Sequence, residues 1–147
     1  RALQQESPLH DDKPPLRTQL SSLIVFDWLI GNTDRWSGAN VKGDAAGQLL
    51  YMRDHDFGFG RLGAEQEQKL FALVQQTERF SHSLIARIRG LTRARFEREL
   101  AQDPNYPRTP ARIDEQAMTG VFTRRDKLLA HIDSLIERYG SSSVLSL

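Results

Sequence analysis

Side chains that can bind a metal ion or move a proton gather in two short segments of the chain. The first segment, 32–40, holds an aspartate between two asparagines, and the second, 54–60, places two aspartates before a glycine-rich turn. Phosphoryl transfer needs an acid that orients the attacking hydroxyl and takes its proton, and oxygen ligands for the Mg²⁺ that bridges the nucleotide phosphates. Asp34, Asn40 and Asp56 are of these types. Their order predicts a site that holds a metal ion and a phosphate group.

A helix is expected to carry the first segment, because an almost wholly apolar run precedes it. We predict this helix from about Thr18 to Ile30, buried on nearly all sides and ended by Gly31. Asp27 lies inside the apolar run. We expect it to cap or pair locally, because buried acids are seldom left without a partner.

A short hairpin is expected between the two segments. Strands are predicted at 40–42 and 48–53, on either side of the sequence Asp-Ala-Ala-Gly at 44–47. Aspartate and glycine in such a position are typical of a hairpin turn. The second strand then leads directly into the acidic turn 54–60.

The second half of the chain is predicted to be helical, because apolar residues recur there at intervals of three and four. The fold class is therefore mainly α with one small β-hairpin. We expect 1–15 to be an extended arm or linker and 141–147 to be a frayed tail. The remaining helices are predicted at 65–76, 80–89, 92–102 and 113–139.

Composition limits the classes of function. A chain of 147 residues, 39% of them hydrophobic, suits one domain with one core. The net charge of +1 gives no overall signal for a polyanionic partner, and the absence of cysteine excludes disulfides and thiolate chemistry. No apolar run approaches the ~18 residues of a membrane span. Because the chain starts at Arg1 and not at Met, we expect a piece of a longer protein.

The two segments resemble the catalytic core of the atypical kinases. Protein kinases carry a catalytic loop H-R-D-x-x-x-x-N, followed by a strand and D-F-G, and 56–58 spells D-F-G after a predicted strand. The run L-I-G-N-T-D-R at 29–35 and the run D-H-D-F-G-F-G at 54–60 are similar to motifs of the secretory-pathway kinases, the four-jointed and Golgi casein kinase group. The CotH kinases, the HipA toxins and the phosphoinositide lipid kinases are more distantly similar.

This resemblance implies a protein-kinase-like C-lobe at 16–140, with a catalytic loop at 31–40, a metal-binding turn at 54–60 and a helical remainder at 65–140. It implies a phosphotransferase that uses ATP and Mg²⁺ (or Mn²⁺). Asp34 would be the catalytic acid, and Arg35 would orient its loop. The residues implied to bind nucleotide or metal are Asn32, Asn40, Gly58, Asp54 and Asp56.

The choice of main metal ligand lies between Asp54 and Asp56. The D-F-G spelling favours Asp56, while the register of the Gly-Phe-Gly turn against the secretory kinases favours Asp54. We favour Asp56, because Gly58 and Gly60 allow the backbone beside it to approach a phosphate closely. Asp54 would then cap the loop of the first segment through Arg35.

The chain departs from the kinase pattern in three ways. Trp36 stands where many relatives have histidine, and Asn40 follows Asp34 by six residues where the protein-kinase pattern has five. A kinase also needs a lysine on an N-lobe strand and its glutamate partner, and no lysine here has that context. We therefore expect the N-lobe on a missing segment or a separate chain. The resemblance is compatible with a secreted or secretory-pathway location, and a cytoplasmic one stays open.

Two other classes of function stay open. In a pseudokinase or interaction module, Asp34 would only form a turn. Alternatively, 80–89 and 92–102 have helix-turn-helix proportions, and their arginines could meet a DNA backbone, although paired charges on a solvated face are the simpler interpretation. We also expect an outward-facing His55, a core Trp28 and a Trp36 that packs within its loop. The arginines concerned are Arg87, Arg89, Arg93, Arg95 and Arg98.

Overall fold

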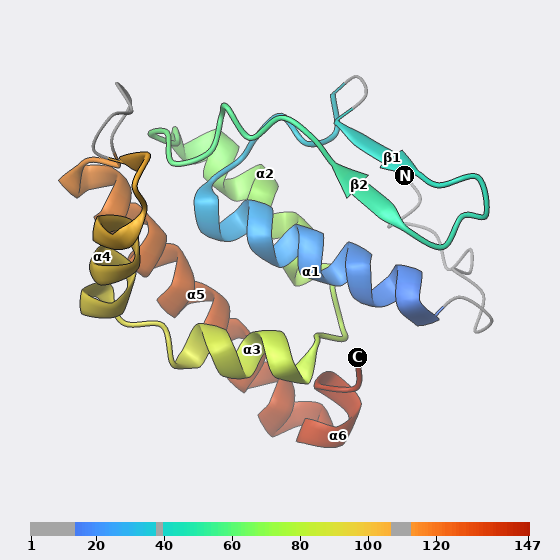
Figure 1. The fold of residues 1–147 in the computed structure, drawn as a ribbon. Coiled ribbons are helices and arrows are strands. Elements are labelled where there is room, and N and C mark those ends of the chain that lie inside the picture. Colours follow the sequence, from blue (N-terminus) through green and yellow to red (C-terminus); the bar gives the residue numbers. More distant parts are fainter. Residues whose placement is uncertain (1–13, 38–39, 107–112) are drawn as a thin grey trace.

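The computed structural model describes residues 14–37, 40–106 and 113–147, which form a helical body with a hairpin along one side (Figure 1). This confirms the prediction of a mainly α fold with one small hairpin. Within these ranges, no helix is both long enough and apolar enough to cross a bilayer. The helices are α1 (Pro14–Ile30), α2 (Ala64–Gln75), α3 (His82–Arg89), α4 (Arg93–Gln102), α5 (Glu115–Tyr139) and α6 (Ser141–Val144). The strands are β1 (Val41–Gly43) and β2 (Leu50–Met52).

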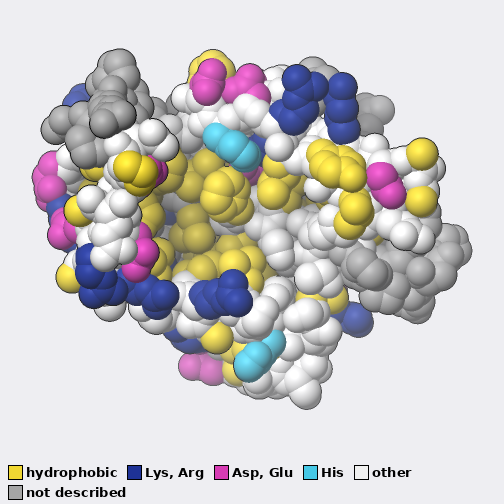
Figure 2. Space-filling view, viewed as in Figure 1, with side chains coloured by type: hydrophobic (Ala, Val, Ile, Leu, Met, Phe, Trp, Pro, Cys, Tyr) yellow, Lys and Arg dark blue, Asp and Glu magenta, His cyan; other side chains and the backbone are white. Residues whose placement is uncertain are grey.

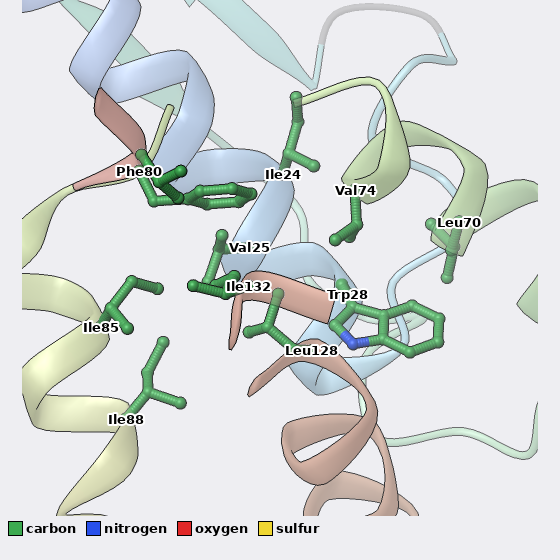
Figure 3. Close-up of a cluster of buried hydrophobic side chains, with 11 residues drawn as sticks. Ile24, Val25, Trp28, Leu70, Val74, Phe80, Ile85, Ile88, Leu128 and Ile132 are labelled. Carbon is green, nitrogen blue, oxygen red and sulfur yellow. The ribbon is translucent and has the colours of Figure 1, made fainter. Parts of the chain in front are cut away.

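Helix α1 supplies the centre of the hydrophobic core, as its nearly continuous apolar sequence predicts. Figure 3 shows side chains of α1 meeting those of α2, α3 and α5. Trp28 is completely buried, and its indole N–H donates to the carbonyl oxygen of Arg124 at 2.8 Å. A buried indole needs such a partner, so the prediction that Trp28 belongs to the core is confirmed. The core residues are Ile24, Val25, Trp28, Leu70, Val74, Phe80, Ile85, Ile88, Leu128, Ile132 and Val144.

Helix α1 begins earlier than we predicted, at Pro14 and not near Thr18. Proline is tolerated in the first turn of a helix because the N–H groups there have no intrahelical partner. The expected arm at 1–15 therefore loses its last two residues to the helix. Its residues 1–13 lie outside the described ranges.

The tail 141–147 is not frayed, contrary to our prediction. Gly140 has a φ of +82° and turns the chain after α5, so that α6 folds back and buries Val144. The backbone then pairs with the segment before α3: Phe80 N–H donates to the carbonyl of Val144 at 2.8 Å, and Leu147 N–H donates to that of Phe80 at 3.2 Å. The tail is anchored because these bonds and the buried valine offset the loss of chain entropy.

The hairpin has the predicted place and turn. Val41 pairs with Met52, and the strands are antiparallel. The Asp44 carboxylate accepts hydrogen bonds from the backbone N–H groups of Gln48 and Leu49, and these bonds lower the pKa of Asp44, the one from Leu49 most. Gln19 of α1 holds the strand from the other side: its Nε2 donates to the carbonyl of Gln48 at 2.8 Å.

His131 is a half-buried ionisable group on α5, and its Nε2 atom is buried. Its ring lies edge-on to Phe71 of α2 with centroids 5.8 Å apart, and its Nε2 has no hydrogen-bond partner among the described residues. Burial lowers the pKa of His131, because the charged ring would lose its hydration.

We predict that His131 makes the fold sensitive to mild acid. In the unfolded chain its pKa is about 6.5, above the folded value. Below about pH 6.5 the unfolded chain therefore binds a proton at His131 more readily than the folded chain, and the free energy of unfolding falls as the pH drops. Above that pH His131 is neutral in both states and does not change the free energy of unfolding. His131→Leu should reduce this fall. Urea unfolding at about pH 7.5 and pH 5.5 measures it, with His82→Gln on the exposed face of α3 as the control. An unchanged fall in His131→Leu would contradict the prediction.

Candidate functional site

The loop that carries Asp34 leaves α1 through a well-defined helix end. Gly31 has a φ of +72°, its N–H donates to the carbonyl of Trp28 at 3.2 Å, and the N–H of Asn32 donates to that of Asp27 at 2.9 Å. This pair of bonds with a left-handed glycine is a Schellman motif. The predicted stop at Gly31 is thus confirmed, and the motif sets the direction in which the loop departs.

Asp27 and Arg35 form a buried ion pair across this loop. Asp27 is 3% exposed and Arg35 is 1% exposed. Arg35 Nε donates to Asp27 Oδ2 at 2.8 Å, and Nη2 donates to Oδ1 at 2.9 Å, so the contact is bidentate. Asn32 Nδ2 adds a bond to Asp27 Oδ1 at 3.2 Å. The expectation that Asp27 pairs locally is confirmed.

The remaining donors of Arg35 reach the second segment. Nη1 donates to the backbone carbonyl of Arg53 at 2.6 Å and to that of Asn40 at 3.3 Å. Nη2 lies 2.7 Å from His55 Nδ1. A guanidinium has donors only, so His55 accepts this bond with Nδ1 and carries its proton on Nε2. Arg35 therefore ties the two predicted segments to each other and to α1.

Asp34 is held inside its own loop. Asn40 Nδ2 donates to Asp34 Oδ2 at 3.0 Å, and the Ser37 hydroxyl donates to Oδ1. The backbone N–H of Asp34 donates to Asn32 Oδ1 at 3.2 Å. Asn40 thus reaches Asp34 although it lies one position beyond the kinase spacing. Asp34 is half-buried, so its carboxylate is fixed in direction while part of its surface stays accessible.

The turn after β2 begins at a strained residue. Asp54 has a φ of +55°, a left-handed conformation that aspartate tolerates better than most residues. Its Oδ1 accepts a hydrogen bond from the N–H of Asp56 at 3.2 Å. The Asp56 side chain is exposed and makes no hydrogen bond or ion pair with the described part of the chain. The two acids therefore differ in freedom: Asp54 shapes the turn, and Asp56 does not.

Gly58 allows this turn to pack closely against the end of α1. A Cβ at Gly58 would lie 2.9 Å from Ile30 Cδ1 and 3.0 Å from the carbonyl oxygen of His55. The next N–H, from Phe59, donates to the carbonyl of Ile30 at 2.6 Å, and Phe59 has a φ of +63°. The space required at Gly58 is thus explained by packing against α1, a reason that differs from the close approach of a phosphate that we expected.

Two expectations about individual side chains need correction, and a third is confirmed with an addition. Asp54 does not meet Arg35 through its carboxylate; the contact is with its carbonyl oxygen, at 3.5 Å. His55 is exposed, as expected, and its ring also bonds Arg35 and lies edge-on to Phe26 at 5.5 Å. Trp36 does not pack within the loop: it is 50% exposed.

The donor set fits a hard divalent cation in chemistry. Asp54, Asp56 and Asn40 offer carboxylate and amide oxygens, which Mg²⁺ prefers, and Mg²⁺ needs few protein ligands because it keeps several waters and phosphate oxygens. Among the described residues, no three acidic or histidine side chains are already grouped as a metal site. The structure thus brings Asp34 and Asn40 together and links their loop to the turn of Asp54 and Asp56, without a closed cage of ligands.

Sequence reasoning missed the partner of Arg35. Asp27 was expected to pair, but nothing identified Arg35 as its partner or His55 as a further acceptor. One signal was present: Asp27 is the acid in a buried run, and Arg35 follows the helix stop by one short loop. A buried acid near a helix end, with an arginine in the next loop, favours such a pair.

Three of the five arginines of α3 and α4 have acidic partners, and Arg87 and Arg95 have none among the described residues. Arg89 pairs with Asp133, and Arg93 pairs with Glu97 at 2.8 Å and with Glu115. These contacts agree with the simpler interpretation of a solvated charged face. An arginine paired with an acid has less positive charge available to neutralise the phosphates of a DNA backbone.

We predict that Arg35 is needed for the fold of the site. Arg35→Met leaves Asp27 buried without its counter-charge, and breaking a buried pair in this way costs about 3–5 kcal/mol. Chemical denaturation should show this loss, whereas Arg53→Gln, which removes an exposed arginine at the end of the same hairpin, should stay within about 0.5 kcal/mol of wild type. The double variant Asp27→Leu/Arg35→Met should recover part of the loss. Equal stability of Arg35→Met and Arg53→Gln would refute the role of the pair.

The chain was compared with models of protein families, with curated proteins and with solved structures, and none of these comparisons gave a match.

Proposed function

We propose that this chain is the C-lobe portion of an ATP- and Mg²⁺-dependent phosphotransferase of the atypical kinase type. The observation that carries the proposal is the bonding of Arg35. One buried guanidinium joins the loop of Asp34 and Asn40 to the end of the strand that precedes Asp54 and Asp56. A phosphotransferase needs its proton acceptor and its metal ligands at a fixed separation, and a shared buried anchor supplies such a constraint.

In this proposal Asp34 orients the acceptor hydroxyl and takes its proton. A general base must be within hydrogen-bond reach of that proton and must be held in direction. The bonds from Asn40 and Ser37 hold the Asp34 carboxylate, and its partial exposure leaves room for a substrate. Asn32 supports the loop backbone at Asp34, and Arg35 acts as a positioning residue.

Asp56 is proposed as the main ligand of the metal ion, with Asp54 and Asn40 as the further oxygen donors. When bound, Mg²⁺ would neutralise charge on the nucleotide phosphates. The exposed and unengaged carboxylate of Asp56 supports this assignment, because the turn does not need it for its own shape. Asp54 has the opposite character, since its carboxylate accepts the N–H of Asp56.

A second lobe is part of the proposal, because this chain lacks the lysine context of a kinase N-lobe. Figure 2 shows hydrophobic side chains exposed over the hairpin, on the same side of the molecule as the acidic turn. Exposed apolar groups gathered in one region are typical of a surface that another domain covers. The large hydrophobic residues exposed on the hairpin and the two site segments are Trp36, Leu49, Tyr51, Met52 and Phe57.

A catalytically inactive relative is the second candidate, and one observation favours it. Both oxygens of the Asp34 carboxylate already accept bonds from within the loop, from Asn40 and Ser37. A turn-forming aspartate does the same. Nucleotide binding separates the two candidates. If the complete protein is a kinase, ATP with Mg²⁺ should raise its Tm. The absence of any such stabilisation would contradict the enzymatic proposal.

Asp34→Asn should separate turnover from binding. The substitution keeps the shape of the side chain and removes the proton acceptor, so phosphate transfer by the complete protein should fall by about 10²–10⁴-fold. The affinity for ATP with Mg²⁺ should change little, because the base acts on the acceptor hydroxyl. Asp126→Asn, at an exposed position on α5, is the matched control. Loss of nucleotide binding in step with turnover would instead make Asp34 a metal or structural residue.

Asp54→Asn and Asp56→Asn should differ in their response to Mg²⁺. Asparagine tolerates a positive φ, so the change at Asp54 preserves the turn while it removes the charge. Titration of Mg²⁺ in the nucleotide-binding assay should show a lost or strongly weakened metal response for Asp56→Asn and a largely retained one for Asp54→Asn. Melting each variant alone checks that both are folded. The reverse pattern would make Asp54 the main ligand.

A further inference from the structure

Arg124 is a buried cation with unused hydrogen-bonding capacity. It lies on α5 and is 7% exposed. Its Nε donates to the carbonyl of Leu29 near the end of α1 at 3.0 Å. Its Nη2 is buried and has no hydrogen-bond partner among the residues that the structure describes. An unpaired buried charged donor is costly, so this arrangement requires an explanation.

Two glycines make the space in which this guanidinium lies. A Cβ at Gly31 would lie 3.2 Å from Arg124 Cζ, and a Cβ at Gly120 would lie 3.0 Å from Nη1. Contacts this short are tighter than side chains normally make. Gly31 at the start of the loop and Gly120 in the second turn of α5 thus leave a recess that the guanidinium group of Arg124 fills.

The recess opens into a pocket of about 250 Å³ at the end of the glycine-rich turn. Arg61, Gln116 and Thr123 line it together with Arg124, and these three side chains make no hydrogen bond or ion pair with other described residues. The pocket thus presents two guanidinium groups, an amide and a hydroxyl, all with free donors.

One acid, Glu67, also lines this pocket. Burial lowers the pKa of Arg124, and the charge of Glu67 raises it by a smaller amount. The Glu67 carboxylate makes no hydrogen bond to Arg124; its Oε1 accepts a bond from Lys127 Nζ at 3.0 Å. The local net charge is positive, because one acid, Glu67, stands against three cations: Arg61, Arg124 and Lys127.

We propose that this pocket binds a phosphate group through Arg124 and Arg61. An arginine fork suits phosphate oxygens, and donors from several directions suit a tetrahedral anion. The volume is below that of a typical pocket for a drug-sized ligand, so the ligand is a single phosphate group and not a whole nucleotide. The group is either free phosphate or a phosphate carried on a small molecule or side chain. This site does not rest on the proposed kinase chemistry.

The test is a thermal-unfolding titration of the 147-residue chain with inorganic phosphate at about 0.1–10 mM, without Mg²⁺ or nucleotide. Sodium chloride at equal ionic strength corrects for screening. Wild type should show a saturable rise in Tm. Arg61→Gln removes an exposed side chain and should fold normally, with at least about a tenfold weaker apparent affinity. Arg98→Gln on α4 removes an exposed arginine elsewhere and should behave as wild type.

A second titration with O-phosphoserine identifies the source of the phosphate group. A similar or larger rise than with inorganic phosphate assigns the site to phosphate esters, and a rise with inorganic phosphate alone assigns it to the free ion. Arg124→Lys keeps the charge but not the fork, so it should bind more weakly than wild type; if it does not fold, Arg61→Gln decides. No rise beyond the chloride control, or an equal rise in Arg61→Gln and wild type, overturns the proposal.

Discussion

The site depends on one interaction, the buried ion pair of Asp27 and Arg35. Removing two charges from water costs several kcal/mol for each ion, and the attraction between them offsets this only with good geometry and satisfied remaining donors. Here the contact is bidentate, and the other Arg35 donors reach the carbonyls of Asn40 and Arg53 and the ring of His55. We infer that the pair contributes less to net stability than to a single arrangement of loop and turn.

The pair also couples the site to the hydrophobic core, because α1 serves both. Neighbouring residues of this helix point in different directions: Trp28 enters the core and bonds the backbone of α5, while Asp27 faces the loop. The end of α1 provides further anchors. The carbonyl of Ile30 accepts a hydrogen bond from the N–H of Phe59 in the turn, and the carbonyl of Leu29 accepts one from Arg124. A shift of α1 relative to α5 would therefore move the acidic loop and the turn together.

Much of this architecture follows from local sequence signals. The apolar run predicts the buried helix, Gly31 its end, and Asp44 the hairpin turn, and each prediction is confirmed because these are local effects. The errors and the missed contacts both concern distant parts of the chain. The tail after Gly140 is ordered by its pairing with Phe80, and His55 is engaged by an arginine from another segment. Spacing within one segment carries no information on such partners.

The structure separates the residues of the two segments into those that build the fold and those that do not. Position 58 requires glycine because a Cβ there would collide with Ile30, and the Asp54 carboxylate accepts a hydrogen bond from the backbone of its own turn. Arg35 and Asn40 hold the loop. Strain at Asp54 and Phe59 persists because these surrounding contacts fix it, and such strain is frequent at functional sites. Asp56 is different, since no contact within the described chain accounts for it. An exposed acid that no described contact uses, beside a turn held by others, is what supports the proposal that Asp56 binds the metal ion.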